Sequence, residues 1–295
     1  MLRLQQYLPT PNGVQANGTG SLNLPLGATY YSLKMEMSDG STNMTIENMV
    51  ARVRNIRLKI NGVQVRQYTS LQELINLNKM HGIETLAGTS SAPKTKGAVV
   101  FYFAEPQRRT PTGEDVFAWQ MYSQLGVQSF NLEFDITSSA SSSFNVQISR
   151  DYAQFPASAL PKTLPNMVFH SSQLLPNDNA GKPTTSTLQK VAYTRIHAFA
   201  PKGTVDGVPT QVLAGAQVKV NNLVIREFRD YAEYESYMFE NGLNTIEDWL
   251  TIPFDETNRY DEILDVRSAN SFEVQYTTKC ANSITLITEE LKSLS

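Results

Sequence analysis

Two stretches of the chain share one pattern of apolar and polar positions. Residues 56–82, IRLKINGVQVRQYTSLQELINLNKMHG, predict a strand, a tight turn, a return strand and a helix that ends at a glycine. Residues 216–242, AQVKVNNLVIREFRDYAEYESYMFENG, repeat this order without a gap at an offset of 160 residues (216 − 56). The pattern therefore predicts two copies of one hairpin–helix unit.

Three kinds of local signal recur at this offset. They are the turns Asn61-Gly62 and Asn221-Asn222, the helix caps Ser70 with Glu73 and Asp230 with Glu233, and the glycines Gly82 and Gly242. Both central residues of a two-residue hairpin turn need positive φ, and a capping pair marks the start of a helix. The agreement favours an internal duplication over two unrelated hairpin–helix units.

The remaining pattern predicts short strands on both sides of the repeat. In the first half we expect strands at 21–24, 30–37, 51–60, 63–68, 97–103, 129–136 and 144–148, with a second helix at 114–125. In the second half we expect strands at 191–199, 217–220, 223–228, 249–254, 271–277 and 283–288, with a helical turn at 289–294. Helices thus fall only in connections, which is typical of antiparallel sandwiches.

The predicted fold is all-β, with two tandem sandwiches. We expect an irregular N-terminal arm at residues 1–18, a first sandwich at 19–153, a proline-rich connection at 154–187 and a second sandwich at 188–295. Two eight-stranded antiparallel sandwiches with Greek-key wiring would be jelly rolls. The prediction is therefore a double jelly roll with short helices in its connections.

Composition narrows the possible functions. The 295 residues suit about two domains, and the net charge of −3 offers no basic field for direct contact with nucleic acid. Charged residues make up only 18%, so we expect neighbouring molecules to cover much of the surface. The single cysteine, Cys280, excludes an internal disulfide, and we expect synthesis in a cytoplasm because no signal peptide or membrane span is recognised.

No catalytic constellation is recognised, so no enzymatic activity or cofactor is expected. The histidines His81, His170 and His197 have no metal-ligand spacing, and Trp119, Trp249 and Cys280 have the contexts of core residues. Glu114-Asp115 and Glu289-Glu290 are interpreted as helix starts, where negative charge is favourable. Asp255, Glu256 and Asp261 bracket a loop that could hold a structural calcium ion or could simply be solvated.

Two groups of residues are candidates for contacts between subunits. Tyr231, Tyr234, Tyr237 and Phe239 make one predicted helix rich in aromatic residues, which suits either an interface between subunits or packing inside its own sandwich. Arg108 and Arg109 could meet an acidic neighbour or could lie in a solvated loop. Both interpretations stay open for each group.

The first half of the chain resembles a known family. LPLGATYYSLKM, IRLKINGVQVRQYTSLQELI, GAVVFYFAEP and SFNLEFDI are similar in order and character to the major capsid proteins of tailless, membrane-containing bacteriophages of the corticovirus type. The likeness is good over residues 22–136 and looser in the second half, where Asn222 replaces the turn glycine.

The resemblance implies a structural role in the virion. It implies homotrimers of pseudo-hexagonal outline that tile an icosahedral capsid over an internal membrane, with minor capsid, vertex and membrane proteins as further partners. It also implies that residues 1–18 lie beneath the shell, against the membrane or a neighbouring subunit. The alternative is a two-sandwich carbohydrate-active enzyme or lectin, which would need a facing carboxylate pair or an aromatic platform.

Overall fold

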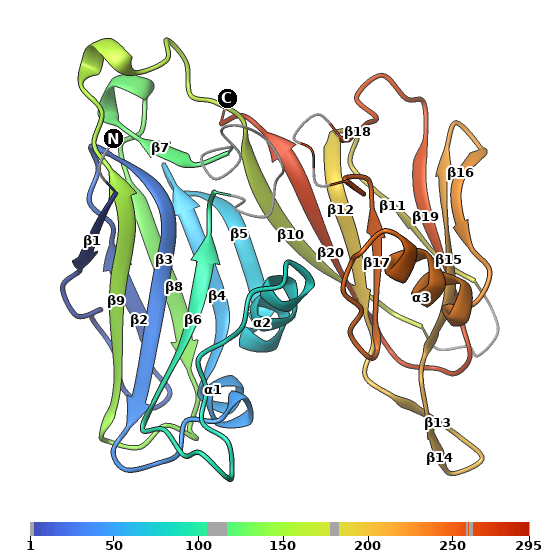
Figure 1. Cartoon of the computed structure of the whole chain (residues 1–295), viewed down its shortest axis with the longest axis horizontal. Coiled ribbons are helices and arrows are strands. Elements are labelled where there is room, and N and C mark those ends of the chain that lie inside the picture. The colour runs from blue at the N-terminus through green and yellow to red at the C-terminus, as the bar shows by residue number, and fades with distance from the viewer. Residues whose placement is uncertain (1–2, 105–116, 178–182, 258, 260–261, 295) are drawn as a thin grey trace. The chain divides into compact units, whose positions relative to one another are not determined.

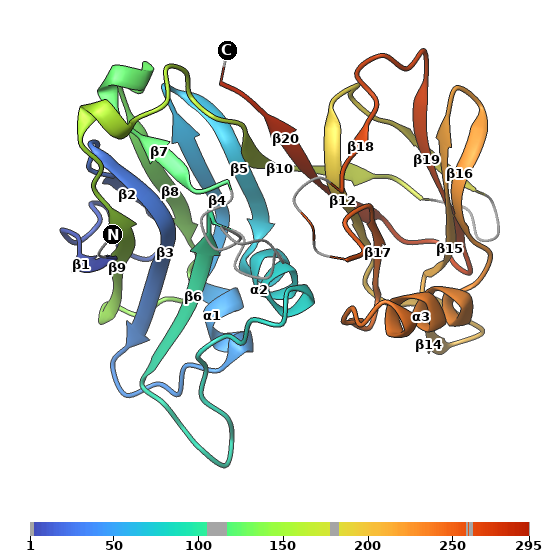
Figure 2. The same ribbon diagram turned by 45° about the horizontal axis from the view of Figure 1, so that its top comes forward.

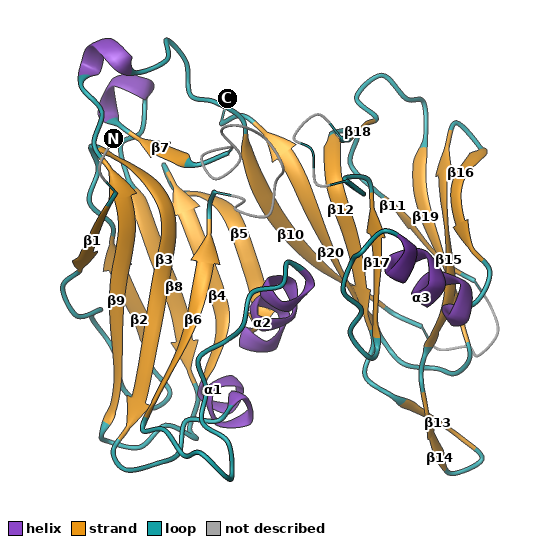
Figure 3. Cartoon of the chain, viewed as in Figure 1, coloured by secondary structure: helices purple, strands orange, loops and turns teal. Residues whose placement is uncertain are grey.

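The computed structural model describes the chain apart from residues 1–2, 105–116, 178–182, 258, 260–261 and 295 (Figure 1). It divides into two compact units, one of Met1–His170 with Ser293–Ser295 and one of Ser171–Lys292. Strands dominate both units, and the helices are few and short (Figure 3). In the part of the chain that is described, no helix is long and apolar enough to cross a bilayer.

The first unit is a sandwich of two sheets. Its strands are β1 (Leu4–Tyr7), β2 (Thr19–Asn23), β3 (Ala28–Asp39), β4 (Val53–Ile60), β5 (Val63–Ser70), β6 (Lys96–Tyr102), β7 (Trp119–Met121), β8 (Phe130–Ile136), β9 (Phe144–Ala153) and the start of β10 (Met167–Leu175). One sheet has the order β1-β9-β3-β6, with β7 beside β3, and the other runs β10-β5-β4-β8-β2. The two sheets face each other across the core (Figure 1).

Alternation along the strands builds this core. In β8 the burial alternates without interruption, so Phe130, Leu132, Phe134 and Ile136 point inward as their spacing predicts. Helices α1 (Ile46–Arg52) and α2 (Leu71–Met80) lie in connections, and α2 contacts β4, β5 and β6. The 3₁₀ turns at Ser123–Leu125 and Ala157–Ala159 complete the helical content of the first unit's described residues.

The second unit is a smaller sandwich of the same kind. Its strands are the rest of β10, β11 (Thr184–Thr187), β12 (Ala192–Phe199), β13 (Gly203–Val205), β14 (Val208–Thr210), β15 (Leu213–Val220), β16 (Leu223–Phe228), β17 (Trp249–Pro253), β18 (Leu264–Asp265), β19 (Phe272–Thr278) and β20 (Ile284–Lys292). One sheet runs β17-β12-β20-β10, with β18 beside β12, and the other runs β11-β19-β15-β16. Helix α3 (Tyr231–Glu240) packs against β15 and β16 (Figure 2).

The hairpin β13–β14 is a sheet of its own. It pairs Gly203–Val205 with Val208–Thr210 around a turn in which Asp206 and Gly207 have φ of 50° and 80°. Its side chains are largely exposed, and it projects from the second unit (Figure 1).

The internal repeat is confirmed in atomic detail. Asn61 and Asn221 both have φ of 51°, and helices α2 and α3 both span ten residues at the offset of 160. A β-bulge follows Leu58 in the first hairpin and Val218 in the second, again 160 residues apart. The duplicated sequence therefore specifies duplicated backbone geometry, including its irregular points.

Two predicted helices are wrong. From residue 117 onward, the expected helix at 114–125 is strand β7 and a 3₁₀ turn, because Trp119 stacks on Phe103 with ring centroids 4.3 Å apart and β7 pairs with β3. Residues 114–116 lie outside the described part. The expected helical turn at 289–294 is mostly the end of β20, so Glu289 and Glu290 are strand residues rather than a helix start.

Three parts of the chain also contain structure that was not predicted from the sequence. The arm at residues 1–18 includes β1, which pairs with β9, and the connection at 154–187 includes β10 and β11. Helix α1 was not predicted, and its last two residues lie in the expected strand at 51–60; the side chain of Thr45 caps it by accepting from the amide of Asn48 at 3.2 Å.

Candidate functional site

Helix α3 and strand β16 together form the candidate contact surface of the second unit. The helix begins at Asp230, whose Oδ1 accepts from the amide of Glu233 at 2.8 Å, and Glu233 Oε2 accepts from the amide of Arg229 at 2.8 Å. It ends where Gly242 takes a φ of 65°, as its counterpart Gly82 does at 74°. The predicted capping pair thus holds α3 in place beside β16.

Tyr234 does not belong to this surface. Its side chain is 0% exposed, its hydroxyl accepts from the amide of Thr251 at 3.2 Å, and its ring meets Phe228 edge to face. Because the residue faces the interior of its own unit, the geometry of Tyr234 fits the second of the two interpretations, packing inside its own sandwich. Met238, one turn later on the same face, is also buried.

Tyr231 and Tyr237 are half-buried at the margin of the same helix. The Tyr231 hydroxyl donates to the carbonyl of Ile246 at 3.1 Å, and burial raises the pKa of Tyr231 to about 12. Tyr237 is hydrogen-bonded to Arg226, whose guanidinium lies 5.1 Å from the ring centroid. Burial, together with the hydrogen bond to Glu256, raises the pKa of Tyr237 well above its usual range.

The exposed apolar residues of strand β16 were not predicted as contact residues from the sequence, although Phe239 of α3 was. Phe239 of α3 is 85% exposed, and Leu223, Val224 and Ile225 of β16 are 68%, 41% and 40% exposed. Alternation could not reveal them, because β-branched and aromatic residues are equally expected in a buried strand or helix. Arg226 of β16 follows these apolar residues in the strand and forms an ion pair with Glu256. A contiguous apolar edge of this kind is typical of a contact with another protein.

The ion candidates are engaged by arginines where the structure describes them. Asp255 Oδ1 accepts from Arg195 Nε at 2.7 Å, and both side chains are almost fully buried. Glu256 pairs with Arg226, while Asp261 lies outside the described residues. The described residues include no group of three or more His, Cys, Asp or Glu that could hold a metal, and a calcium ion at this loop stays an untested prediction.

Arg108 and Arg109 lie in the segment 105–116, outside the described residues. The structure therefore leaves their predicted contact role untested.

A buried polar network in the second unit was not predicted. His197 is 0% exposed; its Nδ1 lies 2.9 Å from Thr251 Oγ1 and its Nε2 lies 3.2 Å from Glu289 Oε1. Thr194 Oγ1 donates to Glu289 Oε2 at 3.1 Å. Cross-strand register brings these residues together, which no sequence-local signal indicates.

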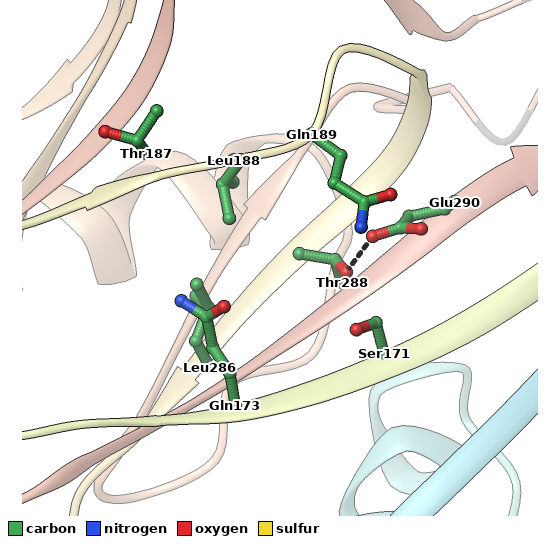
Figure 4. Close-up of a pocket in the computed structure, with 8 residues that line it drawn as sticks. All are labelled: Ser171, Gln173, Thr187, Leu188, Gln189, Leu286, Thr288 and Glu290. Carbon is green, nitrogen blue, oxygen red and sulfur yellow. Dashed lines mark hydrogen bonds between the residues drawn. The ribbon is translucent and has the colours of Figure 1, made fainter.

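Two of the cavities lined by described residues do not resemble a catalytic cleft. One cavity of the second unit, about 70 Å³, is lined by Ser171, Gln173, Thr187, Leu188, Gln189, Leu286, Thr288 and Glu290, with Thr288 donating to Glu290 at 2.6 Å (Figure 4). Small-molecule sites usually measure about 300–1,000 Å³, so this volume suits only water.

A wider groove in the first unit, about 360 Å³, contains a single carboxylate, Asp151, among its lining residues. Burial raises the pKa of Asp151. Hydrolysis of a glycoside usually requires two facing carboxylates. Neither hollow therefore favours the carbohydrate-active alternative.

The two tandem antiparallel sandwiches, each with the same hairpin–helix motif, define a double jelly-roll protein. The model of the viral coat protein P2 N-terminal domain matches residues 5–149, and that of the P2 C-terminal domain matches residues 169–294. The chain belongs to the viral coat protein P2 family, and the resemblance recognised in the sequence is confirmed.

Solved structures share this fold at low sequence identity. The major capsid protein P2 from bacteriophage PM2 superposes with a TM-score of 0.80 at 16% identity, over 100% of this chain and 98% of that one. The STIV major capsid protein gives 0.71 at 11% identity, over 100% and 98% of the two chains. The PBCV-1 capsid gives 0.67 at 10%, over 98% and 93%. No curated protein sequence matches the chain.

Proposed function

We propose that this viral coat protein forms homotrimers of pseudo-hexagonal outline that tile an icosahedral shell over an internal membrane. The observation that carries the proposal is the duplication, in which two sandwiches of one chain share turn, bulge and helix at an offset of 160 residues. Three such chains in a ring offer six similar sides, which is what a hexagonal lattice requires. Closed rings of identical chains are an ordinary form of oligomer.

The exposed surface and the cavities of the chain support a structural role without enzymatic activity. The exposed apolar edge of β16 and the exposed Phe239 are suited to protein contacts, whereas the described cavities are small or lack paired carboxylates. Contacts between trimers can each be weak, because many act together in a shell. Minor capsid, vertex and membrane proteins are the further partners, and synthesis takes place in the host cytoplasm before assembly.

The mass of the purified full-length chain tests this proposal. Native mass spectrometry and light scattering at micromolar concentration should give a trimer, and electron microscopy of the parent particle should give hexagonal tiles. A chain that stays monomeric at this concentration and forms no lattice would contradict the proposal.

A further inference from the structure

Strands β5 and β16 occupy equivalent places in the repeat but differ at their outer edges. In the first unit, β5 pairs on its outer side with the start of β10, parallel to it, with His170 opposite Arg66. In the second unit, β16 is the last strand of the order β11-β19-β15-β16. Its outer backbone N–H and C=O groups therefore have no partner strand among the described residues, and such an edge readily accepts another strand.

The burial of equivalent residues shows what the covering strand does. Val65 is 1% exposed, whereas its counterpart Ile225 is 40% exposed; Arg66 is 2% exposed, whereas the side chain of Arg226 is 23% exposed. The residues before them, Val63 and Leu223, are exposed in both copies. The difference between the units is thus greatest where β10 pairs with β5.

The polar contacts at this edge are also only partly reproduced. Arg66 Nε donates to the carbonyl of Val168 in β10 at 3.2 Å, and so ties the covering strand to β5. Arg226 keeps the same position in the repeat and binds Tyr237 and Glu256 of its own unit. An added strand at β16 would present Arg226 with a backbone carbonyl like that of Val168.

The strand that corresponds to β10 elsewhere in the chain is β1. Strand β10 opens the second sandwich beside its closing strand β20, and β1 opens the first sandwich beside its closing strand β9. The two family models accordingly begin at residues 5 and 169, inside β1 and β10. The segment Met167–His170 that covers β5 therefore has its structural counterpart in Leu4–Tyr7.

Among the described residues, strand β1 also has an outer edge with no partner strand. All four of its residues are exposed, and it is the terminal strand of its sheet. The amide of Leu8 donates to the carbonyl of Ile148 in β9 at 2.8 Å. In an antiparallel pair the backbone groups of successive residues point alternately toward and away from the partner strand. The backbone N–H and C=O groups of Gln5 and Tyr7 therefore point away from β9. Its sequence LQQY carries no charge, so covering it buries no ion.

We propose that β16 of one copy takes β1 of a second copy as an added parallel strand, just as β5 takes Met167–His170. This deepens the proposed trimer and rests on it. Each copy then has one donor strand and one acceptor edge, a head-to-tail contact that forms a ring when it closes after three copies. The exposed side chains of Leu223, Val224 and Ile225 would then lie beside the added strand and be partly covered by it.

Cross-linking of the full-length trimer tests the pairing. In a Cys280→Ala background, Tyr7→Cys combined with Glu227→Cys should give covalent dimers and trimers on a denaturing gel after treatment with a short bismaleimide. The matched control combines Tyr7→Cys with Gln67→Cys, the equivalent position on β5, and should stay monomeric on the gel. A trimer in which the test pair cross-links no more than the control would overturn the proposal.

A backbone variant gives an independent readout. Gln5→Pro removes an N–H that points away from β9, and the concentration at which the trimer dissociates should rise by roughly tenfold for one lost buried hydrogen bond. Gln5→Ala keeps that N–H and should leave dissociation unchanged. Unchanged dissociation of Gln5→Pro would refute the added strand while leaving the trimer intact, whereas a wild-type chain that never forms trimers would refute the proposed function itself.

Discussion

Glu73 and Glu233 occupy one position of the repeat, yet protons should affect them in opposite ways. Glu73 is 5% exposed and accepts from the amide of Thr69 at 3.0 Å; burial raises its pKa to about 7 despite that hydrogen bond. The side chain of Glu233 is 39% exposed, and hydrogen bonds from the backbone and side chain of Arg229 lower its pKa. The substitutions Glu73→Gln and Glu233→Gln therefore separate the two environments.

The pKa of Glu73 gives the sign and size of its effect on the pH dependence of the first unit's stability. A carboxyl raised from 4.5 to about 7 binds more protons in the folded than in the unfolded state between these values, so the stability of the first unit falls as pH rises through this window. At about 1.4 kcal/mol for each pH unit, the loss reaches about 3 kcal/mol by pH ~8. Glu73→Gln removes the ionisable group, so the variant should equal wild type near pH ~4 and exceed it by up to about 3 kcal/mol at pH ~8.

The two tryptophans allow each unit to be followed separately. Trp119 lies in the core of the first unit and Trp249 in that of the second, both 0% exposed. Urea unfolding followed by fluorescence in a Trp249→Phe background reports the first unit, and a Trp119→Phe background reports the second. Variants are compared at one protein concentration, because assembly adds to apparent stability.

The control is the equivalent carboxyl in the second unit. Because the pKa of Glu233 is lowered, its contribution is present above the unfolded value and is lost as pH falls through the folded one. Glu233→Gln should thus destabilise the second unit at neutral pH, and this difference should vanish in acid. Parallel pH profiles of wild type and Glu73→Gln between pH ~5 and ~8 would refute the assignment of a buried, protonated Glu73.

Three further outcomes are expected. Asp255→Ala should destabilise the second unit by about 3–5 kcal/mol in urea unfolding, because buried Arg195 loses this carboxylate, and adding Arg195→Met should restore much of the loss; a change under ~1 kcal/mol would mean that water reaches the pair. Asn61→Pro should cost about 2–3 kcal/mol in the first unit, since proline cannot adopt the observed φ of 51°, while Asn222→Gly should raise the melting temperature slightly; unchanged melting would contradict this account of the turns. Chelation of divalent ions should leave the urea unfolding of the second unit, followed by Trp249 fluorescence, unchanged, because Asp255 and Glu256 are already paired with arginines. A lower urea midpoint after chelation would instead indicate bound calcium.

Local signals were sufficient for the repeat and for most strands. The Asn61 turn, for example, depends on residues adjacent in sequence: an Asn at positive φ followed by Gly62. Its side chain also bridges to a distant loop, where Oδ1 accepts from the amide of Gln128 at 2.7 Å. That second role requires the tertiary fold and could not be predicted from the hairpin pattern.

Errors arose where tertiary contacts outweighed local preference. The run around Trp119 has helical spacing, but stacking on Phe103 and pairing with β3 make it a strand. Glu289 looked like a helix start, yet its burial is compensated by His197 and Thr194, which only the sheet register brings near. Aromatic content similarly marked α3 for contact without showing that Tyr234 faces inward.

The hairpin β13–β14 makes the chain a suitable carrier for an inserted peptide. Among the described residues its two strands pair only with each other. Its tip at Asp206-Gly207 therefore does not take part in the strand pairing of either sandwich. A foreign peptide inserted between these two residues would lengthen an exposed hairpin without shifting any strand of either sheet. Each assembled shell would then carry one such epitope for every copy of the chain.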